Sequence, residues 1–276
     1  DIEETDNNYN FFGNGRKAFY TMNWLSTKSV PSKDGKKGES AGFILWETSK
    51  GYHFKSIDAL FAQKPKKKFI FTATSDAKEV PADYDGKILE HFSDNRINLQ
   101  NKFKMGAYGT KLIRFDPFNC FYEVVEQKAE ETKEGTTNAG KDLPKINKKF
   151  GEPTRTTYML VDKGTLPSGD TEEQIEKNEE ENFESSEILN QGIRRYNQMF
   201  SVMETITIGG DYDLHAGDAI WIDFPSIERD HESNEMNKQN GGLYIISDLC
   251  HYVTPKETYT KMNIIRDSFG RDPKKK

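Results

Sequence analysis

The chain has 276 residues and a formal net charge of −6, with 30% charged and 34% hydrophobic residues. This length suits one large domain or two smaller ones, and the acidic balance argues against a general nucleic-acid binder. Aromatic residues make up 12% of the chain, so we expect a globular body with polar insertions rather than disorder.

Two further absences bound the protein class. No apolar run approaches the roughly 20 residues of a membrane span, and no signal peptide is visible. The opening residues are polar and lack an initiator Met, so the chain is expected to be a fragment of a longer protein.

The N-terminal region predicts a helix and a β-hairpin. Ala18, Phe19, Met22 and Leu25 share one helical face, which predicts a helix over 16–28. Aromatic and branched residues on both sides of a Ser-Lys-Gly turn predict a hairpin over 42–54. A short helix after Ser56 and a strand over 66–74 follow.

The middle of the chain is less regular. The stretch 88–103 has mixed polarity and is compatible with a helix, whereas 108–115 and 120–127 predict strands. A polar loop is expected over 129–155, followed by a strand over 157–161.

An acidic run over 170–187 precedes a strongly periodic segment. Acidic residues favour the N-terminal end of a helix dipole, so this run is expected to open a helix. The helix is predicted to bury a stripe formed by Ile188, Leu189, Ile193, Tyr196, Met199 and Phe200.

The last quarter of the chain predicts four strands, over 201–208, 219–224, 243–253 and 259–266. Short strands separated by Gly, Asp and Pro turns indicate a small antiparallel barrel or sandwich. The charged stretch 226–240 is expected to protrude as a loop. The predicted fold class is therefore α+β, with an antiparallel β-barrel at the C-terminus and a mixed helix and hairpin region before it.

The sequence offers little support for catalysis or metal binding. The five histidines form no H-E-x-x-H pattern, and neither C-x-x-C nor G-x-S-x-G occurs. Glu47 and Asp58 are the better-placed candidates for acid–base chemistry, but both are interpreted as surface charges. We therefore expect no enzyme, no catalytic residue, no metal and no cofactor.

Two other features favour an ordinary structural interpretation. Cys120 and Cys250 lie in apolar, strand-like stretches and are interpreted as buried, reduced thiols. The basic clusters at 64–68 and 274–276 are interpreted as a solvated loop and tail, with docking on an acidic partner as the functional alternative.

The order of the C-terminal segments resembles a known family. The helix EILNQGIRRYNQMF runs into a strand, which is followed by ITIGGDYDLHAGDAIWIDFP and GGLYIISDLCHYVTPKETYTKMNIIRD. This order is similar to the tube-type barrel of the central baseplate hub of contractile-tailed, T-even-like bacteriophages. AFYTMNWLSTK and AGFILWETSKGYHFKSIDALFAQ are similar to the hub's middle region in marine relatives, and LIRFDPFNCFYEV resembles the return to a first tube-type domain.

The resemblance implies three regions: a middle-type helix and hairpin region over 1–106, return strands with a loop insertion over 107–165, and a helix with a tube-type barrel over 166–276. In the family, a first tube-type domain precedes the middle region, and this chain has little sequence before residue 16 to build it. That departure leaves the family's ring only partly assignable to this chain.

The resemblance also implies a structural function in the virion tail baseplate, after assembly in the host cytoplasm. Three copies would form a ring that adapts a threefold spike to a sixfold tail tube, without spanning a membrane. Implied partners are further copies of the chain, the central spike, the tail tube protein and neighbouring baseplate proteins, with DNA passing through the channel unbound. The loops 129–155 and 226–240 are further candidates for contact with the spike or neighbouring proteins.

Two alternatives stay open: a tail-associated cell-wall hydrolase, and the hub portion of a contractile secretion-system spike. For the hub, the candidate interface residues lie on the predicted barrel strands, where alternation sends only one face outward. They are Ile206, Ile208, Trp221, Phe224, Tyr244, Ile246, Met262 and Ile264.

Overall fold

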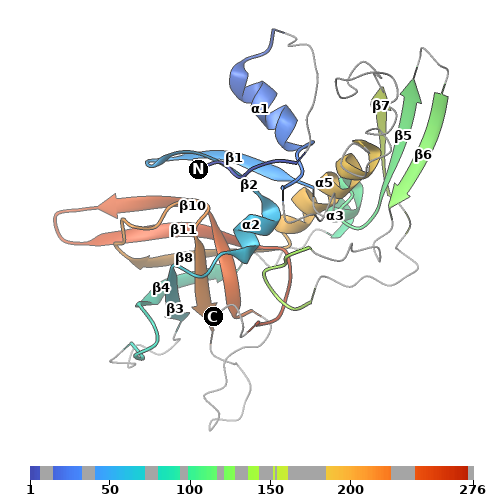
Figure 1. The fold of residues 1–276 in the computed structure, drawn as a ribbon. Helices are drawn as coiled ribbons and strands as arrows, with labels where there is room; N and C mark the ends of the chain where they lie inside the picture. Colours follow the sequence, from blue (N-terminus) through green and yellow to red (C-terminus); the bar gives the residue numbers. More distant parts are fainter. Residues whose placement is uncertain are drawn as a thin grey trace. The chain divides into compact units, whose positions relative to one another are not determined.

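The structure of the chain is a computed structural model (Figure 1). It describes residues 1–6, 15–32, 41–71, 80–93, 99–116, 121–127, 136–142, 152, 154–160, 185–224 and 240–272. Residues 226–239 of the expected loop 226–240, nearly all of the acidic run 170–187, most of the loop 129–155 and Cys120 lie outside these residues.

The described residues form two compact units, and each is assembled from separate stretches of the chain. The helix–sheet unit contains Asp1–Ile57, Asn98–Thr136 and Ile146–Gln198. The barrel unit contains Asp58–Ile97, Thr137–Lys145 and Met199–Lys276. This interleaved grouping differs from the division predicted at residues 106 and 165, which stays a prediction.

The helix–sheet unit begins with the predicted helix and hairpin. Helix α1 covers Ala18–Ser26, and strands β1 (Phe43–Thr48) and β2 (Gly51–Ser56) pair antiparallel. Gly51 has a φ of +115°, a conformation open to glycine and strained for other residues, which explains the glycine in this turn. The N-terminal residues add a short parallel bridge from Ile2 to Phe54 on the outer side of β2.

A second, three-stranded sheet has the order β6–β5–β7. Strand β5 (Thr110–Asp116) pairs antiparallel with β6 (Phe121–Gln127) and parallel with β7 (Arg155–Leu160). These strands were predicted within two residues of their ends. Helix α3 (Leu99–Met105) precedes them.

Helix α5 (Ser185–Met199) organises the helix–sheet unit, largely through polar side chains. Gln191 accepts a hydrogen bond from the Ala41 backbone N–H at 3.0 Å, and Gln198 donates one to the Ala107 carbonyl at 3.0 Å. Tyr196 donates to the Phe43 carbonyl at 2.5 Å. The helix was predicted correctly, but its predicted apolar stripe is only partly right because Phe200 lies beyond the helix and is exposed.

The barrel unit contains a closed six-stranded barrel with the strand order β10–β11–β8–β4–β3–β9. Its strands are β3 (Lys67–Phe71), β4 (Gly86–Ser93), β8 (Val202–Gly209), β9 (Ala219–Asp223), β10 (Gly242–Val253) and β11 (Thr258–Arg266). Helix α2 (Ile57–Ala62) leads into the first of them.

The barrel corrects two expectations. The predicted antiparallel barrel is mixed, because β3 pairs parallel with both β4 and β9. The stretch 88–103 is not one helix, since β4 runs to Ser93 and α3 begins at Leu99. Two strands from the N-terminal half therefore close a barrel that was expected from the last quarter alone.

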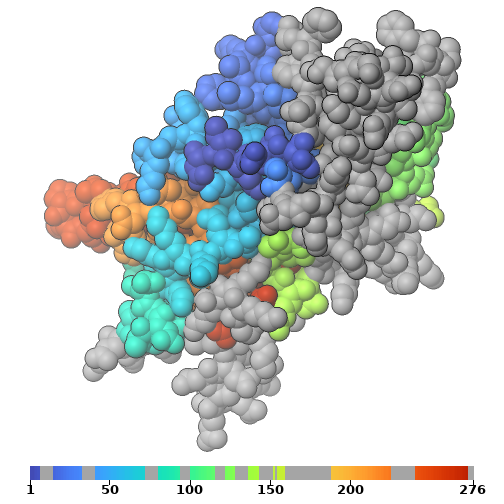
Figure 2. All heavy atoms as spheres, in the orientation of Figure 1, coloured from blue at the N-terminus to red at the C-terminus, as the bar shows by residue number. Residues whose placement is uncertain are grey.

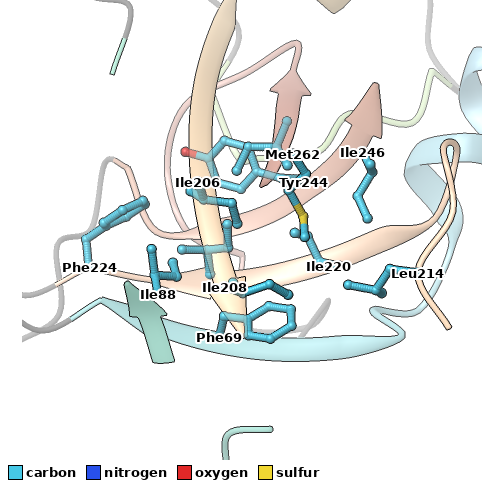
Figure 3. Packing of buried hydrophobic residues seen from close by; sticks show 12 residues of the cluster. Phe69, Ile88, Ile206, Ile208, Leu214, Ile220, Phe224, Tyr244, Ile246 and Met262 are labelled. Atoms are coloured by element: carbon cyan, nitrogen blue, oxygen red, sulfur yellow. The ribbon is translucent and has the colours of Figure 1, made fainter. Parts of the chain in front are cut away.

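The interior of the barrel is filled by side chains. Figure 3 shows isoleucines from β4, β8, β9 and β10 meeting Phe69, Tyr244 and Met262. Burying an aliphatic or aromatic side chain contributes roughly 1.5–3 kcal/mol relative to leaving it exposed. The barrel is therefore a packed core rather than a pore.

Candidate interaction sites

All eight predicted interface residues are buried. None is more than 5% exposed, and Ile206, Tyr244 and Ile264 have no measurable exposed surface. Seven of them belong to the central cluster of the barrel. These side chains pack within the chain's own structure, and their contact with a neighbouring subunit stays a prediction.

Trp221 differs from the other seven because it does not belong to the central cluster. It alternates with Ile220 and Ile222, which do, so its ring lies on the outer face of β9. The Arg271 guanidinium lies 5.4 Å from the centre of this ring. A cation over an indole is a favourable contact, so the C-terminal tail covers this side of the strand.

A buried carboxylate secures the same face. Asp223 Oδ2 accepts hydrogen bonds from Tyr84 Oη at 2.5 Å, Trp221 Nε1 at 2.9 Å and Arg271 Nη2 at 3.0 Å. Burial, together with the hydrogen bond to Asp223, raises the pKa of the Tyr84 phenol well above its usual value. This cluster was not predicted, although an acid inside the apolar run AIWIDF is a signal that sequence reasoning can use.

The barrel leaves part of β10 with an open strand edge. β9 pairs with β10 from Gly242 to Ile245, and the turn before β9 adds two backbone hydrogen bonds at Ile246. Beyond that point, no strand in the described part of the chain pairs with β10 on this side. We call residues 247–253 the β10 edge; they pair only with β11.

The β10 edge belongs to a projecting hairpin. Figure 2 shows the β10–β11 tip, in red, extending past the other described strands of its unit. Tyr252 stacks on Tyr259 with ring centres 4.7 Å apart, and Val253 is 68% exposed. Cys250 is also exposed, so the prediction of a buried thiol is wrong at this position, because the strand continues beyond the core.

The helix–sheet unit has an apolar cleft between α1 and the β1–β2 hairpin. Its volume is about 410 Å³. It is lined by Ile2, Phe19, Met22, Leu25, Leu45, Tyr52, His53 and Phe54. The spacing of Phe19, Met22 and Leu25 had identified one face of this helix, but its exposure to solvent was not foreseen.

The candidate acid–base residues have other roles. Asp58 is 2% exposed and accepts a hydrogen bond from the Thr137 N–H at 2.8 Å, so it is a buried loop anchor rather than the expected surface charge. Glu47 is exposed, as expected. Within the described ranges, no group of three or more His, Cys, Asp or Glu side chains is arranged to hold a metal ion.

His215 is part of a turn rather than a ligand set. Its backbone N–H donates to Asp218 Oδ2 at 2.9 Å, and Gly217 adopts a φ of +89°. Lys66 pairs with the same Asp218 carboxylate at 2.8 Å. The HAGD segment therefore forms a charge-stabilised turn before β9.

Comparisons with known proteins find little similarity in sequence and limited similarity in structure. No family model matches the chain, and no curated protein matches it significantly. The tail protein from Neisseria meningitidis MC58 is similar over 96% of this chain, with 11% identity and a TM-score of 0.46. The phage P2 baseplate in its activated conformation with Ca is similar over 83% of this chain, with 9% identity and a TM-score of 0.21.

The chain spans 61% of the length of the first of these structures and 50% of the second. No helix in the part of the chain that the structure describes is long and apolar enough to cross a membrane.

Proposed function

We propose that this chain is a structural, non-enzymatic subunit of a phage tail baseplate. In this proposal it is a hub protein whose barrel unit associates with copies of itself in a trimeric ring. The ring joins a threefold spike to a sixfold tail tube. Its partners are the spike, the tube protein and neighbouring baseplate proteins, in a virion assembled in the host cytoplasm.

The open β10 edge is the observation that carries this proposal. Among the described barrel strands, residues 247–253 of β10 and 89–93 of β4 pair with a neighbour on one side only. The β10 segment projects beyond the other described strands of its unit, so we assign strand-to-strand contact with another subunit to it. Unpaired backbone groups on an exposed edge are a ready template for pairing with a second chain. Exposed apolar and aromatic side chains on the hairpin, Tyr252 and Val253, add surface that a neighbour would bury.

Ring closure follows from the geometry of such a contact. An edge on one subunit that meets a different surface on the next makes a heterologous contact, and a suitable rotation closes it into a ring. The order of the C-terminal segments, which resembles that of the hub family, supports a threefold ring.

Mass photometry with edge variants tests the proposal. The chain should form particles of three times its 31.7 kDa mass as its concentration rises. Cys250→Lys with Val253→Lys places two cations on the β10 edge, which discourages pairing, and should weaken self-association by at least about tenfold. Met203→Lys is the matched control, because Met203 is exposed on β8, pairs with Ile265 of β11 and lies outside the β10 edge.

Three results would count against the proposal. A monomer at every concentration would contradict the ring. Equal loss of association in Met203→Lys would contradict the β10 edge as the contact. Hydrolysis of peptidoglycan by the purified chain would instead favour a cell-wall hydrolase.

A further inference from the structure

Helix α1 exposes apolar side chains on more than one side. Phe19 is 53% and Tyr20 54% exposed, and Met22 and Trp24 are exposed as well. Ser26 is the only fully buried residue in the helix. Large apolar side chains that lie exposed together on a protein surface commonly mark an interaction site, so the exposure of α1 points to a partner.

Two stripes run along α1. Phe19, Met22 and Leu25 form the wall of the cleft. The second stripe, spaced four residues apart, is Arg16, Tyr20, Trp24 and Lys28. Arg16 lies 5.3 Å from the Tyr20 ring centre and Lys28 lies 4.9 Å from that of Trp24, so a cation stands over an aromatic ring at each end.

The charged residues that flank α1 are all basic. Arg16 and Lys17 precede its first turn, Lys28 follows its last turn, and no acidic residue lies between them. Cations near a helix N-terminus oppose the helix dipole, and Lys17 at the N-cap position makes no side-chain capping bond. Carboxylates from a partner would neutralise this end of the helix.

The cleft restricts the chemistry of its occupant. Its walls are apolar side chains, apart from the His53 ring and the Tyr52 hydroxyl. A peptide in an extended conformation would bring unpaired backbone groups into these walls, and each such buried group keeps its desolvation cost. An α-helix satisfies its own backbone hydrogen bonds and presents only side chains, so it suits such a groove.

We propose that the α1 cleft binds an acidic amphipathic helix of a partner protein. The apolar face of that helix fills the cleft, and carboxylates near its two ends pair with Arg16 and Lys17 on one side and Lys28 on the other. These cations are separated by roughly 16 Å, about three helical turns. A flat membrane surface fits less well, because the apolar lining is concave and a bilayer does not fill a cleft. This inference is independent of the ring proposed above.

Two synthetic helices of about 16 residues test the proposal. Both carry leucines at helical spacing along one face; one has glutamates in its first and last turns, and its twin has lysines there. Calorimetric titration of the full chain should show the acidic peptide binding at least about tenfold more tightly than the basic twin. Met22→Lys, which places a charge in the cleft wall, should lower the affinity for the acidic peptide by a similar factor.

Charge reversal provides the sharper result. Arg16→Glu with Lys17→Glu should invert the preference, so that the basic twin binds more tightly than the acidic peptide. Val253→Lys, on the barrel unit, is the control and should leave both affinities unchanged. Equal affinity for both peptides, no binding of either, or binding of vesicles of anionic phosphatidylglycerol without binding of the acidic peptide would each overturn the proposal.

Discussion

The barrel unit and the helix–sheet unit are stabilised by different means. In the barrel, backbone hydrogen bonds form a nearly complete ring of strands, and apolar side chains fill the interior. In the helix–sheet unit, α5 buries Asn190, Gln191, Arg194, Arg195 and Gln198. Gln191 and Gln198 satisfy backbone groups of Ala41 and Ala107, which lie outside the strands.

This difference predicts where each unit is vulnerable. A barrel core responds to lost volume, because its contacts are many and non-directional. A helix that caps loops through side-chain amides responds to lost hydrogen bonds, because an orphaned buried carbonyl keeps its full desolvation cost. Comparable substitutions in the two units should therefore lower the free energy of unfolding by different amounts.

The largest effect should follow Ile206→Ala. Ile206 is fully buried in the barrel, and truncation of a buried isoleucine leaves a cavity and removes transfer free energy. The free energy of unfolding should fall by about 2–5 kcal/mol, measured by urea titration with the fluorescence of the chain's tryptophans, which lie in both units. Leu89→Ala on exposed β4 is the control and should change it by less than about 0.5 kcal/mol. Similar losses in both variants would contradict the assigned core.

An intermediate effect should follow Gln198→Leu in the helix–sheet unit. The change keeps most of the side-chain volume but leaves the Ala107 carbonyl without its amide donor. We expect a loss of about 1–3 kcal/mol in the same titration. Gln100→Leu, on an exposed position of α3, is the matched control. A stabilised Gln198→Leu protein would show that this unit is held by apolar packing after all.

Alkaline pH should weaken the barrel unit. Burial raises the pKa of Tyr84 and Tyr244 above their ordinary values, so at high pH the unfolded chain releases their protons more readily than the folded chain. The stability that these two tyrosines contribute to the folded state is fully present below roughly pH 10. It is lost as the pH rises toward the pKa values of the folded state. In Tyr84→Phe, the free energy of unfolding, measured by circular dichroism, should fall less steeply above pH 10 than in the unchanged protein. An unchanged decline would exclude Tyr84 as one of its causes.

The smallest effect is expected from Lys17→Asp at the start of α1. Lys17 has the extended backbone of an N-cap residue but no capping hydrogen bond. Aspartate supplies an acceptor and a favourable charge at the dipole, which should stabilise the helix by about 1 kcal/mol, seen as slower amide exchange in α1. The same change should weaken binding of the acidic peptide to the α1 cleft. Lys50→Asp in the hairpin turn is the control and should not slow amide exchange in α1. Faster exchange in Lys17→Asp would contradict the N-cap assignment.

Sequence reasoning recovered the elements better than their arrangement. β8–β11 follow from alternation and turn residues, and α5 follows from its period. The partnership of β3 with β9 joins residues about 150 positions apart, which local pattern does not encode. In β4, Ile88 is buried and Phe92 exposed, and this mixed polarity led to the prediction of a helix.

The candidate sites were predicted less well, for a physical reason. Apolar residues on a strand are typical of both a core and an interface, and the pattern does not separate the two. It therefore predicts interface roles for Ile206 and Ile264, although both are buried within the chain. The β10 edge exists only because β9 is shorter than β10, which depends on pairing rather than composition. The α1 cleft similarly depends on where the hairpin lies beside the helix.

An image of the assembled particle tests the central claim most directly. Electron cryomicroscopy of the chain at concentrations where it associates should show a threefold ring, with residues 247–253 of each copy against the neighbouring copy. A particle in which the β10 edge faces solvent, or images of single subunits only, would contradict the account.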